Sequence, residues 1–249
     1  MDKITVEMLA KTIDHSLLNP IMTDKVLEEG MDIALRYDVA SVCIKPYYVP
    51  RAAEKLKGSK VAVGTVIGFP QGGNTTEIKV REAEQAMAQG AIEIDLVANI
   101  GKVLSEDWAY VEKDLSAVIL AVKKGGARSK VIFENCFLQD THKIRLCQIC
   151  ERAGADWVKT STGYGSGGAT DADLKLMRAN VSAKVQVKAA GGVRTLQRLL
   201  EVVRIGCSRV GATATIAMID EAREKIGTGK TWEEIDKIFP SAGGEGKGY

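Results

Sequence analysis

Residues 92–97 read IEIDLV, and this short stretch alternates apolar and polar positions. One face carries three apolar residues and the other carries two acids and a valine, namely Ile92, Ile94 and Leu96 against Glu93, Asp95 and Val97. A repeat of two residues is typical of a β-strand, whose side chains point alternately to opposite faces. The apolar face predicts contact with helices, so we expect the acidic face to point into the interior of a barrel.

Seven further β-rich runs resemble this stretch and are separated by helix-like segments. The eight runs begin near Thr12 (TIDHS), Ala40 (ASVCIK), Lys60 (KVAVGTVIG), Ile92 (IEIDLV), Lys130 (KVIFEN), Asp156 (DWVKTS), Lys184 (KVQVKA) and Ser208 (SRVGA). Intervals of about 20 to 40 residues suit βα units, in which each strand returns parallel to the last. Eight such units in 249 residues match a (β/α)8 TIM barrel. We therefore predict this α/β fold, with an open doubly wound sheet as the alternative.

Helices are predicted between the strands, with start and stop signals at their ends. They include Glu77–Gln89, Asp107–Lys124, Thr141–Arg152, Asp171–Ala179 and Thr195–Ile205. Thr170 with Asp173 resembles a capping box, and Ser105 precedes two acids that favour a helix start. Glycines stand where three helices are expected to stop, namely Gly90, Gly154 and Gly206.

Composition and charge exclude several classes of protein. The 34 Lys and Arg residues against 32 Asp and Glu leave a formal charge of +2, which is too balanced for a nucleic-acid-binding surface. No run approaches the roughly 18 apolar residues of a membrane span, and the N-terminal residues lack the apolar core of a signal peptide. Five cysteines, an odd count, fit reduced thiols in the cytoplasm. We expect a cytoplasmic single-domain barrel over residues 1–240 and a flexible tail, SAGGEGKGY, over residues 241–249.

Polar residues also occupy the inward faces of the later strands. The residues that share such a face are Trp157, Lys159 and Ser161 in DWVKTS, Lys184, Gln186 and Lys188 in KVQVKA, and Glu134 in KVIFEN. A core built for stability alone would use Val, Ile or Leu here, because burying charges is costly. A compensated ion-pair network is one interpretation. We favour an active site, because Lys159 and Lys188 end neighbouring strands, where this fold builds its active sites.

Two neighbouring lysines have a specific chemical use. An unperturbed lysine, with a pKa of about 10.4, is almost fully protonated at pH 7 and is a poor nucleophile. A nearby cation and partial desolvation both lower that pKa. The neutral amine can then attack a carbonyl to form a Schiff base, while Asp95 keeps the site near electroneutrality and handles protons.

Glycine clusters follow the last three strands. They comprise Gly163, Gly165, Gly167 and Gly168 after the sixth, Gly191 and Gly192 before Arg194 after the seventh, and Gly211 with Thr213 after the eighth. Glycine lets backbone N–H groups approach an anion closely, and a following helix N-terminus favours negative charge. Because the loops after strands seven and eight form the usual phosphate site of this barrel, the pattern predicts a phosphorylated substrate.

Several longer segments together resemble the deoxyribose-phosphate aldolase family, which are class I aldolases with a (β/α)8 fold. The matching pieces are DHSLL, SVCI, TVIGFPQGGNTTEIKVREAEQA, GAIEIDLVANIG, AGADWVKTSTGYGSGGAT, VKAAGGVRT and RVGAT, which run from about Asp14 to Thr213. The resemblance implies reversible cleavage of 2-deoxy-D-ribose 5-phosphate to acetaldehyde and D-glyceraldehyde 3-phosphate, a lyase reaction.

The resemblance also implies roles for individual residues. Lys159 corresponds to the Schiff-base lysine, Lys188 to the second lysine and Asp95 to the proton relay. The implied substrate and phosphate contacts are Asp14, Ser16, Thr162, Gly163, Gly191, Gly192, Val193, Arg194, Gly211 and Thr213. Some family members end in a tyrosine that assists protonation in the site, so Tyr249 is a candidate proton relay.

We expect no metal and no cofactor, because an iminium itself accepts the electrons released on bond cleavage. The CQIC segment, with Cys147 and Cys150, is interpreted as helix packing because no second C-x-x-C accompanies it. Cys43 is interpreted as a buried filler, and His15 as a candidate pocket residue. The expected partners are sugar phosphate and aldehyde substrates, with neither nucleic acid nor membrane, and a second copy of the chain in a dimer.

Two other functions fit the same residues. A different phosphate-binding barrel enzyme, such as another Schiff-base aldolase or a transaldolase-like protein, would share the lysine and the glycines. A non-catalytic barrel that binds phosphorylated metabolites would keep the glycine loops without requiring a neutral Lys159.

Overall fold

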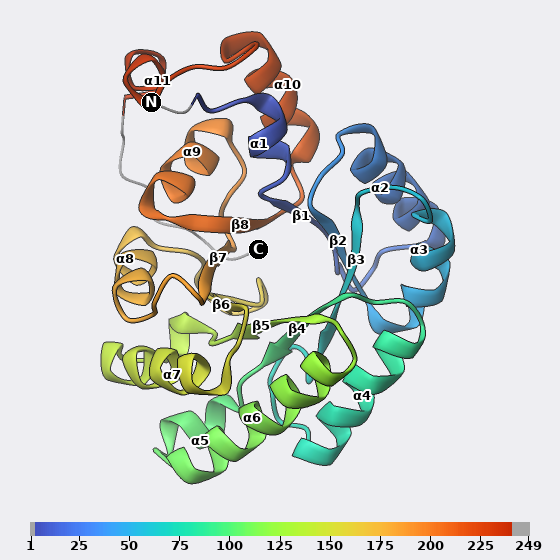
Figure 1. Cartoon of the computed structure of the whole chain (residues 1–249), viewed down its shortest axis with the longest axis vertical. Helices are drawn as coiled ribbons and strands as arrows, with labels where there is room; N and C mark the ends of the chain where they lie inside the picture. The colour runs from blue at the N-terminus through green and yellow to red at the C-terminus, as the bar shows by residue number, and fades with distance from the viewer. Residues whose placement is uncertain (1–2, 241–249) are drawn as a thin grey trace.

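Eight parallel strands close into a barrel in chain order in the computed structural model, which describes residues 3–240 (Figure 1). The strands are β1 (Ile13–Leu17), β2 (Ser41–Ile44), β3 (Ala62–Ile67), β4 (Glu93–Val97), β5 (Arg128–Ile132), β6 (Trp157–Lys159), β7 (Gln186–Ala190) and β8 (Cys207–Ala212). Closure comes from parallel pairing of β1 with β8, in which Asp14 lies opposite Gly211. The predicted (β/α)8 barrel is therefore confirmed, and the open sheet is wrong.

Helices surround the barrel and alternate with its strands (Figure 1). They are α1 (Val6–Ala10), α2 (Asp24–Arg36), α3 (Val49–Lys55), α4 (Thr76–Ala88), α5 (Ile100–Leu104), α6 (Trp108–Lys124), α7 (Asp140–Ala153), α8 (Asp171–Ala179), α9 (Leu196–Ile205), α10 (Thr215–Lys225) and α11 (Trp232–Ile238), with short 3₁₀ turns at Pro46–Tyr48 and Asn135–Phe137. None of the helices within residues 3–240 combines the length and apolar character needed to cross a membrane. The predicted tail at 241–249, Tyr249 included, lies outside the described residues.

Helix caps account for small differences from the predicted boundaries. The Thr170 side chain accepts the Asp173 N–H and caps α8, as predicted. Ser105 does not start α6, because it ends α5, and the Asp107 side chain instead accepts the Tyr110 N–H to cap α6. The predicted glycine stops are confirmed at the ends of three helices, where Gly90, Gly154 and Gly206 adopt positive φ.

The predicted inward and outward positions are confirmed within β4 and β7 and are wrong just before the amino ends of these two strands. Glu93, Asp95 and Lys188 are buried, as expected for inward positions. Lys184 is exposed because it lies in the turn before β7 begins. Ile92 precedes β4 and is 49% exposed instead of packing against the helices. Alternation in the sequence predicts which way a side chain points only where neighbouring strands flank that residue.

Apolar side chains on the outer faces of the strands pack against the helices to form the main core. Ile94 and Leu96 of β4, Val131 of β5, Val158 of β6 and Val187 of β7 are fully buried there. The interior of the barrel, by contrast, holds charged side chains instead of the usual layers of branched apolar residues. The hydrophobic core therefore lies outside the barrel and leaves its interior for polar chemistry.

Two glycine loops touch through their backbones above β6 and β7. A Cβ atom on Gly168 would lie 2.5 Å from the Gly191 carbonyl oxygen, and Gly191 has a φ of +85°. The Ala169 N–H donates to the same carbonyl at 3.0 Å. These glycines are therefore required for close backbone approach, which holds together the loops after β6 and β7.

A buried ion pair on the outside of the barrel fixes the carboxyl end of β4. The Lys79 Nζ atom on α4 lies 2.7 Å from Asp114 Oδ2 on α6 and 3.1 Å from the Val97 carbonyl oxygen. Both side chains are almost completely buried. Because Val97 is two residues beyond Asp95, this pair anchors the strand that carries the central acid of the interior.

Replacing Lys79 with Met should leave the Asp114 carboxylate buried without its cation. We expect the free energy of unfolding to fall by about 3–5 kcal/mol in urea titrations, the usual result of breaking a buried pair from one side. Lys79→Met/Asp114→Leu should recover most of that loss, because neither buried charge remains. The exposed Lys25, which pairs with Glu29 at 3.9 Å, is the control, and Lys25→Met should change little. Equal effects of the two single variants would contradict this account.

Candidate active site

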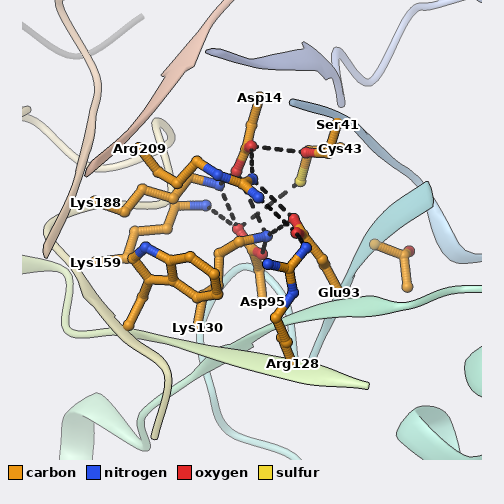
Figure 2. Close-up of polar contacts among 12 residues, drawn as sticks. Asp14, Ser41, Cys43, Glu93, Asp95, Arg128, Lys130, Lys159, Lys188 and Arg209 are labelled. Atoms are coloured by element: carbon orange, nitrogen blue, oxygen red, sulfur yellow. Dashed lines mark hydrogen bonds and ion pairs between the residues drawn. The ribbon is translucent and has the colours of Figure 1, made fainter. Parts of the chain in front are cut away.

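The side-chain nitrogens of three lysines converge on the Asp95 carboxylate inside the barrel (Figure 2). Lys159 Nζ and Lys188 Nζ each lie 2.8 Å from Asp95 Oδ2, and Lys130 Nζ lies 2.9 Å from Asp95 Oδ1. All four side chains are buried. The three residues selected from strand alternation are thus brought together, and Lys130 joins them.

Strand register produces this convergence. Lys159 on β6 lies directly opposite Lys188 on β7, and Asp95 on β4 lies opposite Lys130 on β5. Directly opposed residues on neighbouring strands point to the same face. Barrel closure then brings the β4 acid across the interior to the two lysines of β6 and β7, which pairwise register alone does not do.

A second set of charges lies deeper in the barrel and is nearly self-compensating. Lys130 Nζ lies 2.7 Å from Glu93 Oε2, and the Arg209 guanidinium binds both Glu93 and Asp14. Arg128, which is partly exposed, also binds Glu93. Figure 2 shows the carboxylates of Asp14, Glu93 and Asp95 surrounded by the cationic side chains. A compensated ion-pair network is therefore present beneath the lysine pair, as one interpretation of the sequence anticipated.

The sequence analysis missed Lys130 and Arg209, although a signal for both existed. Lys130 shares its face with Ile132 and Glu134 in KVIFEN, and Arg209 shares its face with Gly211 in SRVGA. Applying the period of two to these runs would have placed both cations inward. In these two runs, Gly211 was assigned to phosphate binding, and only Glu134 was predicted to point into the barrel.

Counting charges identifies the lysine that can be neutral. Among the described residues, three buried acids pair with three buried cations other than Lys159, namely Asp14, Glu93 and Asp95 with Lys130, Lys188 and Arg209. The half-exposed Arg128 adds a further positive charge on Glu93, so the three acids are already neutralised without Lys159.

The directions of the pKa shifts agree with this count. Burial lowers the pKa of Lys159 and the neighbouring Lys188 cation adds to this effect, while Asp95 opposes it. Burial also opposes charge on Lys188, but Asp14 and Asp95 raise its pKa above the ordinary value. Lys159 is thus the candidate nucleophile, and Lys188 is the neighbouring cation.

Asp95 and Asp14 remain carboxylates in spite of their burial. Burial by itself would raise both pKa values, but Lys130 and Lys188 act on both carboxyl groups and hold their pKa values below the ordinary range. Asp14 Oδ2 lies 2.5 Å from Lys188 Nζ, and Ser41 donates to Asp14 at 2.7 Å. Asp14 therefore contacts Lys188 within the network, and its carboxylate is fully buried instead of lining the open cleft.

Other residues considered from the sequence have mainly structural surroundings. Cys43 Sγ lies 3.9 Å from Asp95, and burial raises the pKa of the Cys43 thiol to about 11, so the thiol stays protonated. His15 Nδ1 lies 2.8 Å from Thr215 Oγ1, and burial lowers the pKa of His15 to about 4. Cys147 and Cys150 are fully buried within α7, which confirms helix packing.

The carboxyl-terminal mouth of the barrel holds the remaining candidates. A cleft of about 670 Å³ is lined by His15, Ser16 and Thr213, together with apolar residues of the β1–α2 segment and Tyr164. The Tyr164 hydroxyl donates to the Leu18 carbonyl at 2.7 Å, and its ring meets Phe69 edge-on at 5.5 Å. His15 therefore lines a pocket, as predicted.

The glycine loops after β7 and β8 enclose a small cavity beside this cleft. Its lining contains most of the predicted phosphate residues, namely Gly191, Gly192, Val193, Arg194, Gly211 and Thr213, together with Ala212. The Val193 side chain is buried, so its backbone is the part that can face a ligand. Gly163, with a φ of +93°, and Thr162 belong to the neighbouring loop after β6.

Comparisons with known proteins agree with this arrangement. Residues 8–227 match the family described as DeoC/LacD family aldolase. The chain is 56% identical over 219 residues to a deoxyribose-phosphate aldolase of Rhodopirellula baltica, covering 88% of this chain and 91% of the relative. It is 48% identical over 220 residues to the enzyme of the same name from Clostridium perfringens strain 13, covering 88% of this chain and 96% of that one.

Solved structures show the same similarity in three dimensions. The crystal structure of a putative deoxyribose-phosphate aldolase from Coccidioides immitis superposes with a TM-score of 0.85 at 38% identity, covering 90% of this chain and 88% of that one. A deoxyribose phosphate aldolase from Aeropyrum pernix, described as tetrameric, gives a TM-score of 0.81 at 29% identity, covering 87% and 92%.

Replacing Lys188 with Leu should make Lys159 harder to deprotonate, because the neighbouring cation is removed and the Asp95 charge acts without opposition. At neutral pH, acetylation of Lys159 by acetic anhydride should become roughly tenfold slower, the effect expected of one nearby charge. The rate is followed by mass spectrometry of the Lys159 peptide across a pH series. Lys188→Arg keeps the charge and should stay near the parent profile. An unchanged profile for Lys188→Leu would leave burial as the sole cause of the low Lys159 pKa.

Proposed function

Since the chain belongs to the DeoC/LacD family of aldolases, we propose that it is a deoxyribose-phosphate aldolase (EC 4.1.2.4) in which Lys159 forms the Schiff base. It reversibly cleaves 2-deoxy-D-ribose 5-phosphate to acetaldehyde and D-glyceraldehyde 3-phosphate. The observation that carries the role of Lys159 is the charge balance of the interior, in which the other cations already neutralise the three acids without Lys159.

The reaction begins with attack of the neutral Lys159 amine on the C1 aldehyde of the open-chain sugar. Lys188, which holds its proton firmly beside Asp14 and Asp95, donates that proton to the carbinolamine hydroxyl as water leaves. The positive charge thereby moves from Lys188 to the iminium at Lys159, and the total charge of the site stays constant. Conserving charge matters here because the site is buried.

Bond cleavage then uses the iminium as the electron acceptor. The Lys188 amine takes the proton of the C3 hydroxyl, the C2–C3 bond breaks, and its electron pair forms an enamine on Lys159. Glyceraldehyde 3-phosphate leaves, C2 is protonated, and hydrolysis releases acetaldehyde. Asp95 touches both lysines through one oxygen and relays protons between them, directly or through water. No metal or cofactor is needed, because the iminium supplies the electron sink.

The substrate phosphate is assigned to the small cavity between the loops after β7 and β8. Backbone N–H groups of Gly191, Gly192, Val193 and Gly211 are the proposed donors, with Arg194 supplying the charge. Thr162, Gly163 and Thr213 lie on the adjoining loops and Ser16 lies near the carboxyl end of β1; all four are proposed to contact the sugar. Asp14 is proposed to act on the substrate through Lys188, since its carboxylate is buried against that lysine. The predicted role of Tyr249 remains a proposal.

Two further expectations stay with this function as proposals. The five cysteines are all free thiols, which supports a reducing, cytoplasmic location. A homodimer is proposed and is tested by sedimentation of the purified chain. A transaldolase-like enzyme or a non-catalytic binding barrel would share the glycine loops, and product analysis with authentic sugar phosphates separates both from the proposed reaction.

Borohydride reduction in the presence of acetaldehyde should trap the proposed intermediate. We expect an ethyl group on Lys159, located by peptide mass spectrometry, because the neutral amine forms the iminium that borohydride reduces. The Lys159→Arg variant is the control and should give no adduct. Modification confined to Lys188 would exchange the roles of the two lysines, and absence of any adduct would contradict the Schiff-base mechanism.

Replacing Arg194 with Gln should weaken binding of the phosphate and little else. We expect KM for 2-deoxyribose 5-phosphate to rise at least tenfold, since a charge-assisted contact to phosphate is lost. Turnover of unphosphorylated 2-deoxyribose, measured by acetaldehyde release, should not change. A similar loss with both sugars would place Arg194 outside the phosphate site.

A further inference from the structure

Glu134 is a buried acid that the mechanism above does not use. It follows β5 and is 2% exposed. Its backbone has a φ of +59° and a ψ of 64°, in the left-handed region that non-glycine residues rarely adopt. Among residues 3–240 the other non-glycine positions with positive φ are Asp38 and Glu106, neither of which is buried. A buried acid in a disfavoured conformation requires an explanation.

The backbone around Glu134 is fixed against the strand that carries Lys159. The Phe133 N–H donates to the Lys159 carbonyl at 3.0 Å, and the Asn135 N–H donates to the Thr160 carbonyl at 2.9 Å. Glu134 is held between these two bonds, so it lies beside the end of β6. The left-handed turn therefore keeps Glu134 close to the root of the loop that follows Lys159.

The side chain of Glu134 accepts two hydrogen bonds from Thr162. The Thr162 N–H donates to Glu134 Oε1 at 3.2 Å, and the Thr162 hydroxyl donates to Glu134 Oε2. The Thr162 hydroxyl oxygen in turn accepts the Tyr164 N–H at 3.0 Å. Each donor points toward the acid, an arrangement that suits an ionised carboxylate.

Glycine makes room for this carboxyl group. A Cβ atom on Gly165 would lie 3.1 Å from Glu134 Cδ, so a larger residue would crowd the acid. Because its backbone lies against the Lys159 and Thr160 carbonyls and its side chain is bonded to Thr162, the Glu134 carboxyl group is held near Lys159. Burial raises the pKa of Glu134, whereas the hydrogen bonds from Thr162 and a positive charge on Lys159 oppose that rise.

Formation of the iminium changes the balance around Lys159. Before reaction the positive charge is on Lys188, which has two carboxylate partners, Asp14 and Asp95. Afterwards the charge is on Lys159, for which Asp95 is the one carboxylate in salt-bridge contact within the described part of the chain. Asp14 pairs with Lys188 but not with Lys159, so a second acid near Lys159 would compensate for the loss of this partner.

We propose that Glu134 is this second acid: a positioning residue that stabilises the Lys159 iminium by its charge and fixes Thr162 by its hydrogen bonds. This inference rests on the proposed function. The charged and titratable groups that face Lys159 from the packed strands are Cys43 on β2, Asp95 on β4, Lys188 on β7 and Glu134 after β5. Glu134 belongs to none of the ion pairs described above, so its charge can be removed without breaking one.

The direct test is Glu134→Gln, which keeps the size and the hydrogen-bonding capacity but removes the charge. Borohydride trapping with subsaturating acetaldehyde should yield roughly tenfold less ethylated Lys159 at neutral pH, because the iminium is less stable. The acidic limb of the trapping profile should move to lower pH, because an amine without a nearby anion deprotonates more easily. Glu134→Asp keeps the charge and should keep the limb of the parent enzyme.

A matched control exists at the opposite end of the barrel. Glu151 on α7 accepts the N–H and the hydroxyl of Ser182 at 2.9 Å and 2.6 Å, the same pattern that Glu134 makes with Thr162. Glu151→Gln removes the same charge and should leave trapping unchanged. Thr162→Val should raise KM without moving the acidic limb, since it removes the hydroxyl but leaves the charge of Glu134.

A measurement on the unaltered enzyme tests the proposal even if the Glu134→Gln variant does not fold. Carbon-13 NMR of labelled glutamate carboxyl groups should show the pKa of Glu134 falling when acetaldehyde forms the iminium, because a new cation favours the carboxylate. An unchanged Glu134 titration would overturn the proposal, as would a Glu134→Gln limb that coincides with the parent limb. Absence of trapping in the parent enzyme would instead overturn the proposed function itself.

Discussion

Every charged group in the barrel interior depends on the pairing of the Asp95 carboxylate with three lysines. A buried carboxylate is costly unless cations and hydrogen bonds replace its water, and Asp95 receives all three ammonium groups within 3 Å. Those lysines in turn require further acids, which are Glu93 and Asp14. The interior around Asp95 is consequently polar, although a small apolar cluster of Leu18, Cys43, Val66 and Phe69 lies beside it. The main apolar core lies between the strands and the helices.

An interior of this kind is not the most stable way to fill a barrel. Apolar residues of similar volume commonly stabilise a protein as much as a buried ion pair does. The buried charges instead set the pKa values of the three lysines. The acids raise the pKa values of Lys188 and Lys130, whereas the pKa of Lys159 is lowered. The same balance keeps the total charge constant as a proton moves from one lysine to the other, so that chemistry proceeds without burying a net charge.

The loops at the carboxyl ends of the strands convert this interior into a site for a particular ligand. Gly168 and Gly191 let the loops after β6 and β7 touch, and Glu134 ties the loop after β6 back to β5 through Thr162. Tyr164 reaches from the same loop across the mouth to Leu18. The rigid strands therefore fix Lys159, the proposed nucleophile, and backbone contacts among the loops fix the surfaces around the mouth of the barrel.

The sequence by itself determined the barrel and predicted the residues proposed to react, because alternation along a strand is local and can be counted. It placed Asp95, Lys159 and Lys188 inward, and it located the helix stops at Gly154 and Gly206. It misplaced Lys184, since no local pattern shows where neighbouring strands begin. Only the tertiary structure decided which acid each cation meets and which lysine has its pKa lowered, because barrel closure joins β1 to β8 and brings Asp95 of β4 to Lys188 of β7. Burial and opposing charges, which arise from residues distant in the chain, then set the pKa of each group.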